Sequence, residues 1–154
     1  MGITMGHLQF QTSSPIEPKK LMDYLTDFTS FQKFFPHQIK DIKILERKNN
    51  EVITQETIIF STLIKSTFTQ KSHHKLISDK ELHTKIIEGP AKGSMIEIIC
   101  TKNEQGSQIT FNVDLKLSLK AKFLEPFIKK LYKRYLTAII YKINDRQYEK
   151  KNYD

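Results

Sequence analysis

The residues best suited to metal or nucleophilic chemistry are few and lie far apart in the sequence. His73 and His74 are adjacent, and adjacent residues of a strand project to opposite faces, so they do not predict a joint metal site. Cys100, the single cysteine, lies in an apolar stretch without a histidine spaced to act as its base, so we interpret it as a core residue. One cysteine allows no internal disulfide, which is typical of a reducing compartment. We therefore expect a cytoplasmic protein without metal or cofactor.

Two residues are candidates for acid–base chemistry. His74 is the first, because histidine titrates near neutral pH; the alternative is a buried histidine whose hydrogen bonds are satisfied. Glu88 is the second: no paired carboxylates are expected to project inward, and Glu88 is the one possible acid, at the end of its strand beside the glycine loop. The following loop, residues 89–93 (GPAKG), does not precede a helical pattern and lacks the spacing of the common phosphate motifs, so we interpret it as a strand connection.

The spacing of apolar residues predicts the elements that position these groups. A short strand over 7–13 precedes a helix that begins at Glu17-Pro18 and a second, shorter helix over 30–35. Dense β-branched residues and recurring turn signals then predict six strands, over 39–47, 51–61, 64–76, 81–88, 94–102 and 107–119. Helical spacing returns from Phe123 to about Tyr148. The order β-α-α-β6-α indicates an α+β domain over residues 1–154, with the last few residues as a frayed tail.

Alternation along the last strand allows the two faces of the sheet to be assigned. Carrying the pairing back from hairpin to hairpin predicts this inner face: Ile53, Gln55, Thr57, Ile59, Phe68, Gln70, Ser72, His74, Leu76, Leu82, Thr84, Ile86, Ile96, Ile98, Cys100, Ile109, Phe111, Val113, Leu115, Leu117 and Leu119. Glu56 and Lys43 are left as an outer pair. Buried polar groups are costly without partners, whereas a cavity with apolar walls and a few polar groups is typical of a small-molecule site. The alternatives are that the polar groups pair with one another, or that the register slips by one residue.

The net charge of +8 comes almost entirely from lysine, with only three arginines. Lysine is the usual solvated cation, which argues against nucleic-acid binding and leaves an anionic membrane surface as an alternative partner. The loops at 61–63, 89–93 and 118–122 are expected at one end of the sheet, where Lys65, Lys92, Lys120 and Lys122 would surround a pocket mouth. No apolar run approaches the roughly 20 residues that a membrane helix needs.

Three stretches resemble one known family. Residues 14–27 (SPIEPKKLMDYLTD), continuing to Phe34-Phe35-Pro36, resemble its opening helix and aromatic-proline stop. Residues 88–90 (EGP) resemble its strand-end turn, and residues 108–114 (QITFNVD) resemble its last strand. The combination is similar to the polyketide cyclase/dehydrase and coenzyme-Q-binding branch of the START-like (SRPBCC) superfamily. This resemblance implies a helix-grip fold, in which a seven-stranded curved antiparallel sheet surrounds a long C-terminal helix. It also implies a cavity between them for lipids, quinones or polyketides.

These observations predict a binder or carrier of a hydrophobic small molecule. The expected ligand-binding residues are Phe68, Gln70, His74, Thr84, Ile86, Ile98, Phe111, Val113, Leu131, Tyr135 and Ile139. One alternative is a metal-free cyclase or dehydratase in the same cavity, with His74 or Glu88 moving protons. A second is a lysine-rich module that binds a partner or a membrane. The oligomeric state stays open.

Overall fold

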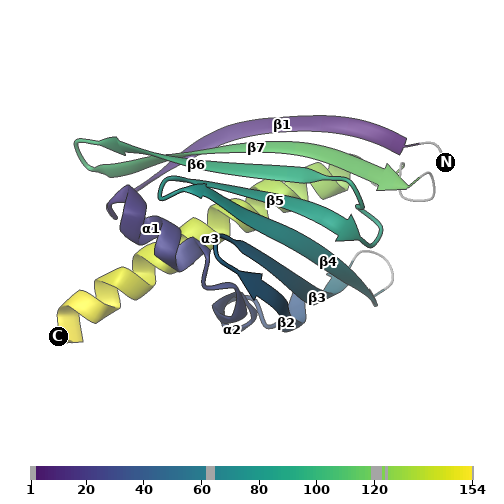
Figure 1. Cartoon of the computed structure of the whole chain (residues 1–154), viewed down its shortest axis with the longest axis horizontal. Helices are drawn as coiled ribbons and strands as arrows, with labels where there is room; N and C mark the ends of the chain where they lie inside the picture. Colours follow the sequence, from purple (N-terminus) through teal and green to yellow (C-terminus); the bar gives the residue numbers. More distant parts are fainter. Residues whose placement is uncertain (1–2, 62–64, 119–122, 124, 154) are drawn as a thin grey trace.

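The computed structural model describes residues 3–61, 65–118, 123 and 125–153. Within these residues, one antiparallel sheet in the order β1-β7-β6-β5-β4-β3-β2 curves around the helix α3 (Figure 1). The elements are β1 (Ile3–Ser14), α1 (Pro18–Leu25), the 3-10 helix η1 (Phe28–Ser30), α2 (Phe31–Phe34), β2 (Ile39–Lys48), β3 (Glu51–Ser61), β4 (Lys65–Ser78), β5 (Glu81–Glu88), β6 (Met95–Asn103), β7 (Gly106–Ser118) and α3 (Glu125–Tyr153). The predicted α+β helix-grip fold with seven strands is confirmed.

Most predicted boundaries lie within two residues of the observed ones. The two larger differences are at the ends of the chain: β1 begins at Ile3 and not at residue 7, and α3 extends to Tyr153 and not to about 148. Met5-Gly6 interrupts the alternation of β1, but every residue from Ile3 to Ser14 has a partner on β7, and this pairing extends the strand. The predictions for the loops at 62–64 and 119–122, and for Leu124, lie outside the described residues.

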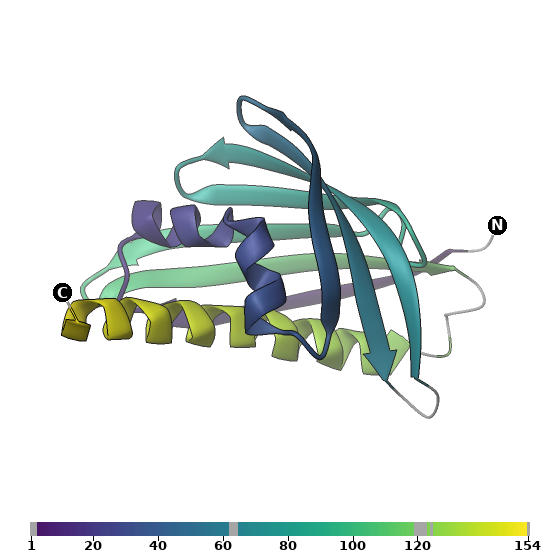
Figure 2. The same cartoon turned by 90° about the horizontal axis from the view of Figure 1, so that it is seen from below.

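The main core lies between the sheet and the helices. Figure 2 shows α1, α2 and α3 on the same side of the curved sheet. The inward-facing residues of β7 are 2% exposed or less: Ile109, Phe111, Val113, Leu115 and Leu117. Leu136, Ile140 and Ile143 of α3 belong to this buried set, together with Leu21 and Met22 of α1. The amphipathic helices are thus held by one apolar core. No helix in the described part of the chain is long and apolar enough to cross a membrane.

The inner face is as predicted on β4 to β7 but inverted on β3. Cys100 lies opposite Ile109, Ile98 opposite Phe111, and His74 opposite Thr84, as expected. On β3, however, the residues paired with inner-face residues of β4 are Val52, Thr54, Glu56 and Ile58. The predicted inner set Ile53, Gln55, Thr57 and Ile59 is therefore wrong, and Glu56 and Lys43 do not pair, since Glu56 lies opposite Ile42. Each of the two β3 faces has two aliphatic and two polar residues, so the pattern does not distinguish them.

The loop after β5 is a strand connection, as predicted. Gly89 and Gly93 have φ angles of +116° and +93°, values that favour glycine. The amide of Lys92 donates to the carbonyl of Gly89 (3.1 Å), and the amide of Ser118 at the end of β7 donates to the carbonyl of Pro90 (3.3 Å). The 89–93 loop and the end of β7 therefore lie together, as the meander predicts.

Candidate functional site

Four side chains on three neighbouring strands form a continuous hydrogen-bonded chain on the inner face. The hydroxyl of Thr54 donates to Glu56 Oε1 (3.0 Å). Thr54 Oγ1 also lies 2.8 Å from His74 Nε2, and His74 Nδ1 lies 2.8 Å from Thr84 Oγ1. We call Thr84, His74, Thr54 and Glu56 the polar chain.

The direction of these hydrogen bonds follows from the number of hydrogens. A threonine hydroxyl has one hydrogen, and that of Thr54 is directed to Glu56. Thr54 must therefore accept from His74, whose Nε2 carries the proton, and Nδ1 accepts from the hydroxyl of Thr84. Every donor in the polar chain points toward the Glu56 carboxyl.

The strand register brings these residues together. Thr54 and Glu56 are two apart on β3, and therefore share a face. His74 on β4 lies directly opposite Thr84 on β5, and one pair away from the Thr54–Ser72 pair. Direct and diagonal neighbours on one face of a sheet are within reach of polar side chains.

His74 is a buried, uncharged histidine at neutral pH. Its ring stacks on Phe28 of η1, with centroids 3.9 Å apart and an interplanar angle of 21°. Burial lowers the pKa of His74 from its ordinary value of 6.5 to about 3, and repulsion from His73 adds to this. His73 itself faces the other side of the sheet, 3.3 Å from the Glu51 carboxylate, which confirms that the two histidines point apart. The satisfied-histidine interpretation of His74 therefore fits the geometry.

Glu56 is an inward-facing carboxyl that the sequence analysis placed on the outer face, because the predicted faces of β3 were inverted. Burial raises the pKa of Glu56 from 4.5 to about 7, although the hydroxyls of Ser72 and Thr54 and its own backbone lower it. The second oxygen, Oε2, is buried without a hydrogen-bond partner among the described residues. A correct β3 register would have revealed this site, because Thr54-x-Glu56 then faces Ser72-x-His74.

Helix α3 presents two tyrosines to this carboxyl. Burial raises the pKa of Tyr132 to about 12, and the negative charge of Glu56 adds to the rise. The pKa of Tyr135 is raised for the same two reasons, with Tyr132 as a third. Tyr135 also packs against Phe35, with ring centroids 4.9 Å apart. The polar chain and the tyrosines thus occupy facing sides of the interior.

The packing of the inner face differs between its two ends. The inward side chains of β7 are completely buried. By contrast, Glu56 and Ile58 of β3, Phe68 and Gln70 of β4, and Tyr132 and Tyr135 of α3 are only half-buried. Several inward side chains of β3 and β4 therefore keep some accessible surface, whereas Thr54, Ser72 and His74 on the same strands are buried.

The predicted ligand-binding residues occupy three kinds of position. Thr84 and His74 are in the polar chain; Phe68, Gln70 and Tyr135 are half-buried near it. Buried core positions hold Ile86, Ile98, Phe111, Val113 and Ile139. The prediction that Leu131 faces the interior is wrong. Leu131 is 39% exposed, while its neighbours Ile128 and Tyr132 pack against the core. The apolar stripe of α3 is so wide that the sequence did not determine which of its residues face the core.

Glu88 does not face the interior. Its side chain is 60% exposed and forms an ion pair with Lys71 (3.3 Å), so the prediction that it is the inward acid is wrong; Glu56 has that position. Cys100 is 1% exposed and burial raises its pKa to about 12, which fits its interpretation as a core residue. No group of metal-ligating side chains is found in the described ranges.

We expect Glu88→Gln to change the free energy of unfolding by less than about 1 kcal/mol, because exposed ion pairs contribute little. Urea denaturation at neutral pH measures this. A loss of several kcal/mol would contradict the placement of Glu88 at the surface.

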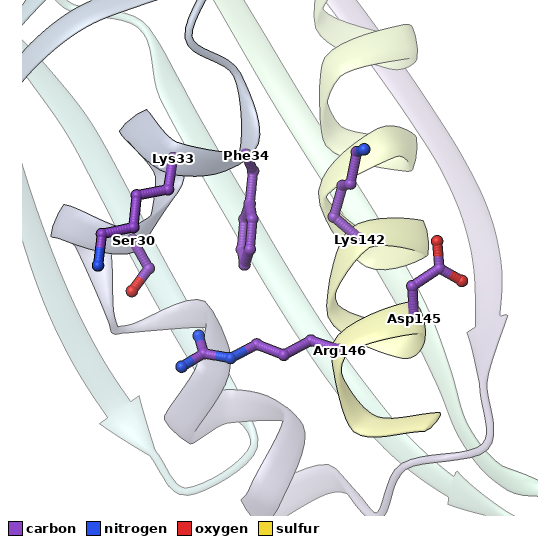
Figure 3. Close-up of a pocket in the computed structure, with 6 residues that line it drawn as sticks. All are labelled: Ser30, Lys33, Phe34, Lys142, Asp145 and Arg146. Atoms are coloured by element: carbon purple, nitrogen blue, oxygen red, sulfur yellow. The ribbon is translucent and has the colours of Figure 1, made fainter. Parts of the chain in front are cut away.

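A separate open pocket lies between α2 and α3. Its volume is about 440 Å³ and its lining residues, drawn in Figure 3, are Ser30, Lys33, Phe34, Lys142, Asp145 and Arg146. Arg146 is also 3.7 Å from Asp27. This pocket shares no residue with the polar chain.

Comparison with known proteins is consistent with this architecture. The family model described as polyketide cyclase / dehydrase and lipid transport matches residues 14–142. A search of curated protein sequences found no significant match.

Solved structures with the same fold have low sequence identity to the chain. The protein TTHA0849 from Thermus thermophilus is 8% identical, with a TM-score of 0.77 and coverage of 92% of this chain and 96% of that one. The Zhui aromatase/cyclase from a Streptomyces species is 13% identical, with a TM-score of 0.74 and coverage of 90% and 93%. Ginseng major latex-like protein 151 from Panax ginseng is 14% identical, with a TM-score of 0.66 and coverage of 92% and 97%. The helix-grip architecture and the family match over residues 14–142 together show that the chain belongs to the polyketide cyclase / dehydrase and lipid transport family.

Proposed function

We propose that this protein binds a hydrophobic small molecule between its curved sheet and α3. The observation that carries the proposal is the half-buried state of four inward side chains of β3 and β4 and of two tyrosines on α3, beside a fully buried inner face of β7: Glu56, Ile58, Phe68, Gln70, Tyr132 and Tyr135. Transfer of an apolar ligand onto such side chains removes surface from water at both partners, which is favourable by roughly 25 cal/mol per Å².

Three further features support this location. The walls contributed by Ile58 and Phe68 are apolar, whereas the polar chain supplies a small number of oriented polar groups. Sites for small molecules combine these two properties. The family to which the chain belongs is described by polyketide cyclisation, dehydration and lipid transport, and lipid transport requires a bound apolar molecule.

A second candidate function, a cyclase or dehydratase, is favoured by Glu56 alone. A buried carboxyl whose pKa is raised to about 7 is suited to exchange protons at neutral pH. In this alternative Glu56, and not Glu88, moves the proton, and His74 orients it through Thr54. Loss of turnover in Glu56→Gln with an unchanged ligand affinity would favour the enzyme over the carrier.

The binding proposal is tested by native mass spectrometry with a lipid, a quinone and a polyaromatic probe. We expect at least one probe to bind at one molecule per chain. Gln70→Trp should reduce this binding at least about tenfold, because the indole occupies the inner space opposite Glu56. Thr69→Trp is the matched control, since Thr69 is the next residue on the same strand and is exposed.

Absence of binding by all three probes would contradict the proposal. So would equal losses in Gln70→Trp and Thr69→Trp, because the space between sheet and helix would then not be the binding site. Circular dichroism of both variants separates loss of binding from loss of folding.

A further inference from the structure

The outer face of α3 near its start combines exposed apolar side chains with exposed cations. Phe127 and Leu131 are 62% and 39% exposed, and Lys130 and Arg134 are exposed as well. These four residues have the spacing i, i+3, i+4 and i+7, so they form one continuous surface on the helix. We call them the outer patch. Phe123, two residues before α3 begins, adds an aromatic ring that is 75% exposed.

The cations of the outer patch have no acidic partner among the described residues. None of the ion pairs found there includes Lys130 or Arg134, whereas the nearby Glu125 is paired with Lys129 (3.6 Å). After Glu125, the next acidic residue along the sequence is Asp145. The charges that this part of the helix presents beside Phe127 are therefore positive, and they attract an anionic surface.

A second pair of exposed apolar side chains has different surroundings. Leu45 and Ile77 are 48% and 46% exposed, near the ends of β2 and β4 and thus at the opposite end of the meander from the start of α3. The cation close to Leu45 in sequence, Lys48, is paired with Glu46 (3.3 Å). Single exposed apolar residues are common and need no partner. Leu45 and Ile77 therefore serve as controls for the outer patch.

The charge pattern distinguishes a membrane from a second copy of the chain as the partner. A twofold dimer would place the same patch of both subunits face to face, so Lys130 and Arg134 would meet like charges. A bilayer with anionic lipids instead offers negative charge at its headgroups and an apolar layer beneath them. Phenylalanine and leucine beside lysine and arginine are typical of helices that lie in this interface.

The position of the outer patch also relates it to the interior. Ile58 and Phe68 are paired near the end of β3 and the start of β4, and both are half-buried. Figures 1 and 2 show the start of α3 at this same end of the molecule. A bilayer at the outer patch would therefore adjoin the end of the protein at which these inward side chains keep accessible surface.

We propose that the outer patch docks the protein onto membranes that contain anionic lipids. Phe127 and Leu131 insert among the headgroups, while Lys130 and Arg134 lie beside the negative charges of the lipids. The helix lies on the bilayer and does not cross it. This docking goes beyond the binding function proposed above, because it uses the outer face of α3 and requires no molecule in the interior.

Sedimentation of the full chain with lipid vesicles tests the proposal. One set of vesicles consists of phosphatidylcholine, and in the other about one third of the lipid is phosphatidylserine. At about 0.1 M salt we expect partition onto the anionic vesicles to be at least about tenfold stronger. Most of this difference should be lost at about 1 M salt, because the Debye length falls from about 10 Å to about 3 Å.

Two double variants test the apolar part of the patch. Phe127→Gln combined with Leu131→Gln should weaken partition at least about tenfold, because the apolar area that enters the interface is removed. Leu45→Gln combined with Ile77→Gln is the matched control and should stay within about twofold of the wild type. Circular dichroism of each variant verifies that the fold is retained.

A second pair of double variants tests the charges. Lys130→Gln combined with Arg134→Gln should weaken partition onto the anionic vesicles at least about tenfold, since each cation near an anionic surface contributes to binding. Lys19→Gln combined with Lys20→Gln removes the same charge from exposed positions of α1 and should weaken partition by about threefold or less.

A fluorescent reporter tests the location directly. The chain contains no tryptophan, so a single tryptophan reports on its own surroundings. The emission of Phe127→Trp should shift to shorter wavelength when anionic vesicles are added, because the indole leaves water. The emission of Ile77→Trp should not shift.

Absence of vesicle binding, equal partition onto the two kinds of vesicle, or equal losses in the outer-patch variants and their controls would overturn the inference. So would a wild-type dimer that Phe127→Gln with Leu131→Gln makes monomeric in analytical ultracentrifugation, because a second copy would then cover the patch. The lipid, quinone and polyaromatic probes should bind this double variant as they bind the wild type. Failure of docking and failure of the proposed binding function are therefore distinguishable.

Discussion

The His74→Gln variant should lose the acid sensitivity that His74 gives the wild type, a difference of up to about 5 kcal/mol in the free energy of unfolding between pH 6.5 and pH 3. Burial lowers the pKa of His74 from 6.5 in the unfolded chain to about 3 in the folded one. Between these two pKa values, His74 is protonated in the unfolded state and neutral in the native state. This stability is present above pH 6.5 and is lost as the pH falls toward 3, at about 1.4 kcal/mol per pH unit.

Urea denaturation between pH 3 and pH 8 measures this dependence. The variant will also lose stability at all pH values, because the stacking of His74 on Phe28 and two hydrogen bonds are removed. The slope with pH, and not the absolute value, is the diagnostic quantity. His73→Gln, on the outer face, is the control that should keep the slope of the wild type. An unchanged slope in His74→Gln would show that His74 is not buried in the neutral form.

The Glu56→Gln variant should be more stable than the wild type at pH 8, by up to about 3 kcal/mol. Burial raises the pKa of Glu56 from 4.5 to about 7, so the native state holds a proton that the unfolded state has released. The stability that the protonated Glu56 contributes is therefore fully present below pH 4.5 and is lost as the pH rises through 7. Glutamine is uncharged at every pH and avoids this loss while it keeps the shape of the side chain.

The same denaturation series tests this second prediction. The gain in Glu56→Gln should be present at pH 8 and absent near pH 4.5, and the exposed control Glu46→Gln should show neither effect. A variant less stable than the wild type at pH 8 would mean that the hydrogen bonds to the carboxylate outweigh the cost of its burial, and would contradict the raised pKa of Glu56. Natural proteins keep such destabilising groups where function requires them.

The two dependences have opposite signs and overlap between about pH 4.5 and 6.5. As the pH falls through this range, the contribution of His74 decreases while that of Glu56 increases, both at about 1.4 kcal/mol per pH unit. The wild type should therefore show little net change from this pair there. Each single variant removes one contribution and so reveals the other.

The architecture was predictable because it depends on patterns that repeat over many residues. β5 was predicted over 81–88, its observed range, because turn signals bound it on both sides. The inner face of β7 followed from an uninterrupted alternation of five described apolar residues, all of which are buried. Errors in single positions do not change such patterns.

The candidate site was predictable only in part, because it depends on strand register, and a shift by one residue moves every side chain of a strand to the opposite face. His74 and Thr84 were placed on the inner face correctly, since they lie on strands linked to β7 by regular hairpins. Glu56 was not, because Val52-x-Thr54-x-Glu56-x-Ile58 and the alternate residues of β3 are equally apolar. The hydrogen bonds from Thr84 to Glu56 join three strands and leave no motif within any one of them.

The pairing of β1 with β7 has a consequence for synthesis of the chain. His7 and Asp114, which lie opposite each other on these strands, are 107 residues apart in sequence. During translation β1 leaves the ribosome first, yet its backbone partner emerges only when most of the chain has been made. Until then the nascent meander has open edges on β2 and on the last strand made, while β1 has no partner strand, and such unpaired edges recruit other chains. A ribosome that stalls before β7 would therefore release a polypeptide prone to aggregation. A ribosome that stalls within α3 would release a chain in which β1 can already pair with β7.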